Sequence, residues 1–194
     1  MMRSKRFFTF LFLCLALSTV AQNKYEKEYR IPKSEFPSNA LQMVSPYLED
    51  AKRVRFYHET DSTKKSYELK LKKGRLHYSI EFNQNGDLED VEFLIKETDV
   101  PEESWARITD QLQSKFKKIR IKRIQQQHPA GSTGVEKVLR DAFQNLILPT
   151  INYELVFTTK GEKGYQTFEG LFSAEGQLIK LRESLSADYD HILY

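Results

Sequence analysis

The chain has a single cysteine, Cys14, which lies inside an N-terminal apolar run. Without that run the chain has no cysteine, which excludes disulfide bonds, thiol catalysis and cysteine metal sites. Glycine-rich loops that could cradle a phosphate group are missing too. The apolar run is too short to span a membrane comfortably, and no second run follows it.

The N-terminus has the pattern of a secretory signal peptide. Three basic residues precede an apolar run over residues 7–17, and small residues at 19–21 predict cleavage after Ala21. The alternative is a lipid anchor on Cys14, but bulky Leu13 stands where lipoprotein signals place a small residue. We therefore expect export to the periplasm or secretion, with no integral membrane segment after cleavage.

The mature chain carries no net charge. Three of the 30 basic residues lie in the leader, which leaves 27 basic residues against 27 acidic ones. Nucleic-acid binding therefore loses its usual electrostatic support, and we do not expect a nucleic-acid partner.

Alternation of apolar and polar residues predicts a run of β-strands. Each strand has one apolar and one polar face at period two, and the strands fall at residues 54–58, 67–72, 76–82 and 91–95. Asn85 and Gly86 supply the backbone angles of a tight reversal between the last two. The pattern predicts an antiparallel meander with one apolar face.

An apolar sheet face needs a cover, and helical stripes precede both sets of strands. One stripe consists of Ala40, Met43, Tyr47 and Ala51, and the other of Trp105, Ile108, Leu112 and Phe116. Pro46 predicts a break in the first helix because it removes a backbone donor. We expect both stripes to face the core.

Sequence matches between the halves suggest a duplication. KRVRF at residues 52–56 matches KKIRI at 117–121, and the YEL of residues 67–69 recurs at 153–155. We predict an α+β fold of two duplicated helix-plus-meander units, whose strands could join into one curved sheet with helices on one face. The alternative is generic alternation shared by chance. The predicted divisions are a signal peptide 1–21, a lead-in 22–35, a first repeat 36–98, a second repeat 99–186 with a helical insertion 129–150, and a tail 187–194.

The segments SYELKL, IEFNQNGDLEDVEF, NYELVF and GLFSAEGQLIKL carry a family resemblance. Over most of residues 36–184 the chain resembles the PepSY-like and beta-lactamase-inhibitor-like families of exported bacterial proteins. The resemblance implies tandem repeats of a helix and a meander, and a role in protein binding or peptidase restraint. The insertion at 129–150 departs from the simplest family pattern.

Patterns that indicate catalysis or metal binding are missing. The histidines at 58, 77, 128 and 191 do not pair at helical spacing, and neither GxSxG nor SxxK occurs. The acidic residues Glu89, Asp90 and Glu92 lack the spacing of a calcium loop, and we interpret them as a solvated strand edge. We expect no enzyme activity, no cofactor and no metal.

The polar strand faces provide the candidate binding residues. They are Arg53, Arg55, Lys70, Lys72 and His77, which could form a basic patch facing a carboxylate, a glycan or an acidic protein. The alternative is ordinary surface, since Glu68 and Glu81 interleave. We predict a binding protein for a protein or peptide partner, acting in peptidase restraint or envelope regulation. The alternative function is a small-ligand or lipid carrier with a cavity between sheet and helices.

Overall fold

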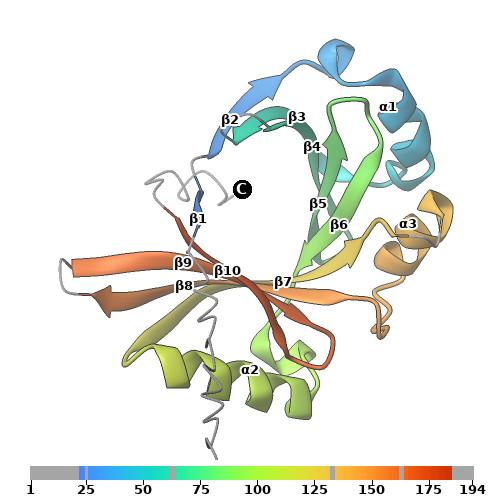
Figure 1. Cartoon of the computed structure of the whole chain (residues 1–194). Helices are drawn as coiled ribbons and strands as arrows, with labels where there is room; N and C mark the ends of the chain where they lie inside the picture. The colour runs from blue at the N-terminus through green and yellow to red at the C-terminus, as the bar shows by residue number, and fades with distance from the viewer. Residues whose placement is uncertain (1–21, 25, 62–63, 132–133, 162–163, 185–194) are drawn as a thin grey trace, which may run out of the picture.

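The computed structural model describes residues 22–24, 26–61, 64–131, 134–161 and 164–184, so the predicted signal peptide and tail lie outside the described residues. Within those residues one sheet of ten strands dominates, in the order β1-β10-β9-β8-β7-β6-β5-β4-β3-β2 (Figure 1). The strands are β1 Gln22–Lys24, β2 Glu26–Ile31, β3 Lys52–Asp61, β4 Lys64–Lys73, β5 Leu76–Asn83, β6 Leu88–Leu94, β7 Ile119–Pro129, β8 Asn152–Gly161, β9 Gly164–Ser173 and β10 Leu178–Ser184.

The described helices are short. They are α1 Ser38–Val44, α2 Glu102–Lys115 and α3 Val135–Phe143, with 3-10 turns at Lys33–Glu35, Ser45–Tyr47 and Glu97–Asp99. The predicted break at Pro46 is confirmed, because α1 ends at Val44 and a 3-10 turn containing the proline follows. None of the helices within the described ranges is long and apolar enough to cross a membrane.

The prediction of an α+β fold built from two duplicated helix-plus-meander units is wrong. β6 pairs directly with β7, with Phe93 opposite Gln126, so the strands before and after α2 belong to one hydrogen-bonded ladder. The physical reason is that a separate meander would leave the backbone groups of an edge strand unpaired. The sheet organises the fold, and the helices are accessories to it. The four predicted strands themselves are confirmed as β3, β4, β5 and β6.

The core lies between the sheet and the helices, which Figure 1 shows on the outer side of the curved sheet. One cluster packs α1 and α3 against strands β3 to β6, with Ile80 and Phe82 fully buried. The other packs α2 against β7 to β9, with Tyr153 and Phe157 fully buried. Trp105 is partly buried against this second cluster, which confirms the predicted core role of its stripe.

Two tight turns meet the helices closely. Asn39 of α1 donates hydrogen bonds to the carbonyls of Asn85 and Gly86, at 2.9 and 3.1 Å. Gly176, with φ +82°, lies against α2, where a Cβ would come within 2.4 Å of the Ser104 carbonyl oxygen. Gly86 also has positive φ, +79°, and a Cβ there would come within 2.3 Å of Asn39 Oδ1. Both turns therefore favour glycine at these positions.

The first two strands join the two edges of the sheet. β1 and β2 are separated by one residue, yet β1 pairs in parallel with β10 and β2 pairs with β3 at the opposite end of the strand order. The Cα atoms of Lys24 and Glu26 can be at most ~7 Å apart. The sheet therefore curls until both edges contact one short N-terminal segment. We call the face away from the helices the inner face.

Candidate functional site

The inner face is polar, and several of its charged side chains are buried. Strand register places on it the residues Glu28, Glu59, Glu68, Lys70, Ser79, Glu81, Asp90, Glu92, Gln125, Gln127, Glu154, Glu169 and Arg182. Glu59, Glu68, Glu92 and Glu169 are only 3% to 6% exposed. Buried carboxylates are rare in proteins unless they are paired or hydrogen-bonded, so each needs a partner.

Lys70 is the cation of the first carboxylate cluster. Its Nζ atom lies 2.5 Å from Glu28 Oε2 and 2.9 Å from Glu68 Oε2, and 4.8 Å from the centre of the Tyr57 ring. Burial lowers the pKa of Lys70, but the Glu68 and Glu28 carboxylates outweigh burial and hold that pKa above its usual value. Glu68 also accepts a hydrogen bond from Ser79 Oγ. The ammonium group stays charged inside the sheet.

The same cluster has the spacing of a metal site. Carboxylate oxygens of Glu28, Glu59 and Glu68 lie within 4.8 Å of one another. Lys70, however, bonds to two of these three carboxylates and already supplies the positive charge that a metal would bring. We therefore interpret the group as a buried ion cluster.

A second carboxylate cluster surrounds Glu92. Gln125 Nε2 donates to Glu92 Oε2 at 2.5 Å, and Gln127 Nε2 donates to Glu92 Oε1 at 2.9 Å. Burial, followed by the charge of Glu154, raises the pKa of Asp90 to about 8, and the same two causes raise the pKa of Glu92. The interpretation of these acidic residues as a solvated edge is wrong for Glu92, because β6 lies between β5 and β7 in the curled sheet.

The raised pKa of Asp90 predicts a stability that falls as pH rises. At Asp90 the folded state holds more protons than the unfolded state between about pH 4 and about pH 8, so the contribution of this group to the free energy of unfolding decreases across that window. Asp90→Asn cannot ionise, and should increase the free energy of unfolding near pH 8 by about 1–2 kcal/mol while changing it little near pH 4.

Urea unfolding at a series of pH values measures this effect. Asp110→Asn, which changes an exposed carboxylate on α2, is the matched control and should leave the pH dependence as it is in the wild type. An unchanged slope in Asp90→Asn would contradict the prediction.

The structure brings the five predicted binding residues onto neighbouring strands. Arg55 lies opposite Lys70, and Lys72 lies opposite His77. Burial lowers the pKa of His77, and so do the positive charges of Lys72 and Arg53. These two cations therefore lie near enough to His77 to act on its ring. Arg53 has φ +56° and lies where the register between β3 and β4 shifts, between Lys52 and Arg55. At this point the side chains of β3 no longer alternate regularly between the two faces.

Lys70 differs from the other four because its charge is neutralised by Glu28 and Glu68. The remaining four residues, Arg53, Arg55, Lys72 and His77, lie at one end of the inner face, and we call them the basic rim. Their part in binding stays a prediction. Sequence alternation found the rim, but it gave no sign that Glu28 of the lead-in would reach Lys70.

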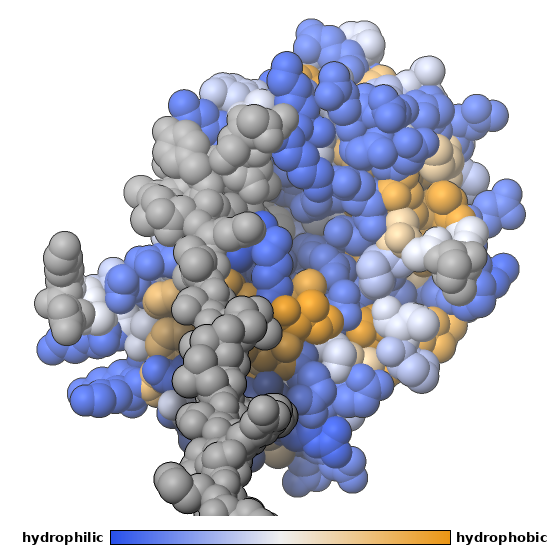
Figure 2. All heavy atoms as spheres, in the orientation of Figure 1, coloured by the Kyte–Doolittle hydropathy of each residue, from blue (hydrophilic) through white to orange (hydrophobic). Residues whose placement is uncertain are grey.

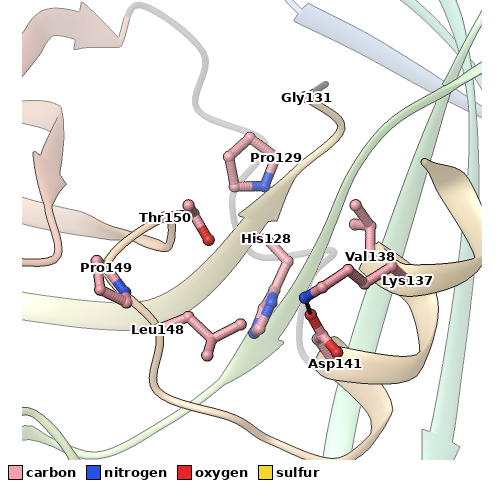
Figure 3. Close-up of a pocket in the computed structure, with 9 residues that line it drawn as sticks. All are labelled: His128, Pro129, Gly131, Lys137, Val138, Asp141, Leu148, Pro149 and Thr150. Carbon is pink, nitrogen blue, oxygen red and sulfur yellow. Dashed lines mark hydrogen bonds and ion pairs between the residues drawn. The ribbon is translucent and has the colours of Figure 1, made fainter. Parts of the chain in front are cut away.

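A pocket lies on the other side of the sheet, beside α3 (Figure 3). Its volume is about 270 Å³, and its lining consists of His128, Pro129, Gly131, Lys137, Val138, Asp141, Leu148, Pro149 and Thr150. The sequence reasoning missed these residues. The only signal was the i, i+4 spacing of Lys137 and Asp141, which form an ion pair on α3.

Exposed hydrophobic residues gather next to this pocket. Leu146 and Ile147, which follow α3, are 37% and 55% exposed. Figure 2 shows hydrophobic atoms beside α3, and others near the centre of the same view. Exposed apolar side chains therefore lie next to the pocket in sequence, whereas the basic rim consists of basic side chains.

Comparisons with known proteins identify the fold. No protein-family model and no curated protein matches the sequence. A BLIP-like protein from Bacteroides fragilis superimposes with a TM-score of 0.50 at 14% identity, covering 82% of this chain and 92% of that one. The chain has a BLIP-like fold.

Two further structures share the BLIP-like fold. A DUF2874 family protein from Bacteroides ovatus has a TM-score of 0.51 at 12% identity, covering 82% of this chain and 94% of that one. A protein from Bacteroides eggerthii, described as periplasmic, has a TM-score of 0.52 at 8% identity, covering 81% of this chain and 94% of that one. The beta-lactamase-inhibitor-like part of the resemblance is thus supported at the level of fold, whereas the PepSY-like part stays a prediction.

Proposed function

We propose that the chain is an exported, non-enzymatic binding protein that holds an acidic segment of a protein or peptide partner at its basic rim. The observation that carries this proposal is the rim itself, where the cationic side chains of Arg53, Arg55 and Lys72 gather with His77 at one end of the inner face. Lys70 is ion-paired with Glu68, so this acidic residue of β4 is already neutralised and does not cancel the charge of the rim.

The chemistry of the rim favours carboxylates as ligands. Arginine and lysine donate charge-assisted hydrogen bonds to carboxylates, and charges of one sign at the end of a concave face strengthen the local field. The lowered pKa of His77 reports this field, because it reflects the positive charges of Lys72 and Arg53 as well as burial. An acidic partner segment would relieve the repulsion among the rim residues.

Export is supported by two separate observations. The leader at residues 1–21 has the pattern of a secretory signal. The similar structure from Bacteroides eggerthii is described as periplasmic. Peptidase restraint or envelope regulation are the roles that we propose for a binding protein of this kind in that compartment.

A capture experiment with a rim variant tests the proposal. The immobilised chain is exposed to a bacterial envelope extract and compared with the double variant Arg55→Gln/Lys72→Gln. We expect the variant to bind the captured partner at least about tenfold more weakly, because each substitution removes a charge-assisted contact. Binding to the wild type should also weaken as salt concentration rises.

The matched control is Lys115→Gln/Lys118→Gln, which removes two exposed charges, one on the last residue of α2 and one three residues later, neither on the strands that carry the rim. It should capture the partner as well as the wild type does. Equal losses in the rim and control variants, or none in either, would refute the proposed role of the rim.

The pocket beside His128 favours a second candidate function, small-ligand carriage. It lies between β7, α3 and the segment 146–150, where a carrier of this fold would hold its ligand between sheet and helix.

A further inference from the structure

The pocket beside α3 combines buried polar groups with apolar walls. His128 is 4% exposed and Asp141 is 6% exposed. Val138 of α3 and Leu148 of the segment after α3 supply apolar surface. Figure 3 shows the His128 ring, the end of the Lys137 side chain and the Leu148 side chain turned toward one another. Three separate elements therefore contribute to one small space.

The hydrogen-bond network fixes the protonation of His128. Gln126 Nε2 donates to the carbonyl of Leu146 at 2.9 Å and also lies 2.9 Å from His128 Nε2. An amide nitrogen carries two hydrogens, so its second hydrogen goes to His128 Nε2, which must accept. Burial lowers the pKa of His128 to about 4, so the ring is neutral near pH 7. The ring proton is then on Nδ1, which is left as a hydrogen-bond donor.

Lys137 and Asp141 are the charged residues that line the pocket. Asp141 is ion-paired with Lys137, and the Nε of Arg140 lies 3.8 Å from Asp141 Oδ1. Two cations thus share one carboxylate. The side chains of Lys137 and Arg140 are 51% and 56% exposed, whereas that of Asp141 is 8% exposed. Arg140 is not among the residues that line the pocket, so a ligand would meet one accessible cation, the Lys137 ammonium, beside the buried Asp141 carboxylate.

We propose that this pocket binds a small aliphatic carboxylate, with its carboxylate at the Lys137 ammonium and its hydrocarbon chain between Val138 and Leu148. The His128 Nδ1–H group and the Thr150 hydroxyl are additional donors. This proposal deepens the second candidate function and does not depend on the basic rim. The cavity volume of about 270 Å³ lies just below the range of roughly 300–1,000 Å³ typical of pockets for drug-sized ligands, which fits a smaller molecule.

The carboxylate can come from a short free acid or from the C-terminus of a peptide with an aliphatic last residue. Amide NMR spectra of the full mature chain, titrated with four probes, separate these sources. The probes are pentanoate, pentanamide, a tripeptide with a C-terminal leucine, and the same tripeptide amidated. We expect saturable shifts at α3 and residues 146–150 with at least one carboxylate probe, and none with either amide.

Two variants test the assigned contacts. Lys137→Met should weaken carboxylate binding at least about tenfold, because it removes the charged donor. Thr150→Trp places a bulky ring at an exposed border position and should block the pocket without disturbing the core. Lys115→Met, an exposed helical lysine elsewhere, should bind as the wild type does, and circular dichroism verifies that each variant is folded.

The outcomes separate cleanly. Saturation by pentanoate alone assigns a free acid, and saturation by the tripeptide alone assigns a peptide terminus. Equal binding of acid and amide, no binding by either acid, or shifts that persist in both Lys137→Met and Thr150→Trp would overturn the proposal. The rim variant Arg55→Gln/Lys72→Gln should retain the shifts at α3 and residues 146–150. A failure of carboxylate binding at the pocket is therefore distinct from a failure of partner binding at the rim.

Discussion

Lys70→Met should lower the free energy of unfolding by about 3–5 kcal/mol, which is the cost of removing one partner from a buried ion pair. The ammonium of Lys70 bonds to Glu28 and Glu68, and its side chain is only 23% exposed. Methionine keeps the length of the apolar stem but leaves these carboxylates next to Glu59 without a cation. Urea unfolding near pH 7 measures the loss.

Two comparisons show whether the loss comes from the ion cluster. Lys72→Met changes the next inner-face lysine of the same strand and should cost less than about 1 kcal/mol. Adding Glu68→Gln to Lys70→Met should recover at least about 1 kcal/mol, because the variant then has one unpaired carboxylate fewer. Equal costs for Lys70→Met and Lys72→Met would show that the buried cluster is not stabilising.

Gly176→Ala should cost about 3 kcal/mol of stability, for two reasons that add. Gly176 has φ +82°, a backbone conformation that L-residues rarely adopt, and a Cβ there would lie 2.4 Å from the Ser104 carbonyl oxygen of α2. That oxygen belongs to helix backbone, so it cannot move aside as a flexible side chain can. The turn and α2 would have to separate, and Ser104 and Gln111 would lose their hydrogen bonds to the turn carbonyls of Ala174 and Gly176.

The control for this substitution is Gly74→Ala. Gly74 also has positive φ, +59°, but a Cβ there would meet no atom within 4 Å. Its cost should be only the backbone strain, about 1 kcal/mol. Thermal unfolding of both variants gives the difference, and similar melting temperatures would mean that the contact between turn and α2 contributes little.

Strand alternation predicted local structure well, because it depends on which side of a strand meets the core. β5 follows it closely, because Tyr78, Ile80 and Phe82 are buried and the residues between them are not. Alternation does not indicate which strands pair with each other, because the apolar and polar residues of every strand alternate with the same period of two residues. Alternation therefore left the joining of the strands into one curved sheet as a possibility only, and could not establish that β6 pairs with β7 and that a single sheet replaces the two units.

The burial of the inner face could not be predicted for a related reason. A polar side chain at a polar position normally indicates solvent, and Glu92 fits that pattern in sequence. It is buried because β1 and β2 draw the edges of the sheet together, and the polar lead-in at residues 22–35 gives no periodic signal for these strands. The basic rim was predictable because it lies at the end of the face. The pocket was not, because β7, α3 and residues 146–150 meet only in three dimensions.

The N-terminal segment has a consequence for the order of folding. The parallel pairing of Gln22 with Arg182 joins residues from the two ends of the described chain, and contacts of such long sequence separation form slowly because the loop that they close is entropically costly. The hairpin from β4 to β5 needs no such closure. Nascent chains should therefore assemble the meanders first and close the sheet last, because β1 cannot pair until β10 has been made. Until then β1 lacks its partner and the most recently made strand is an open edge, on which a chaperone or a second molecule can add a strand.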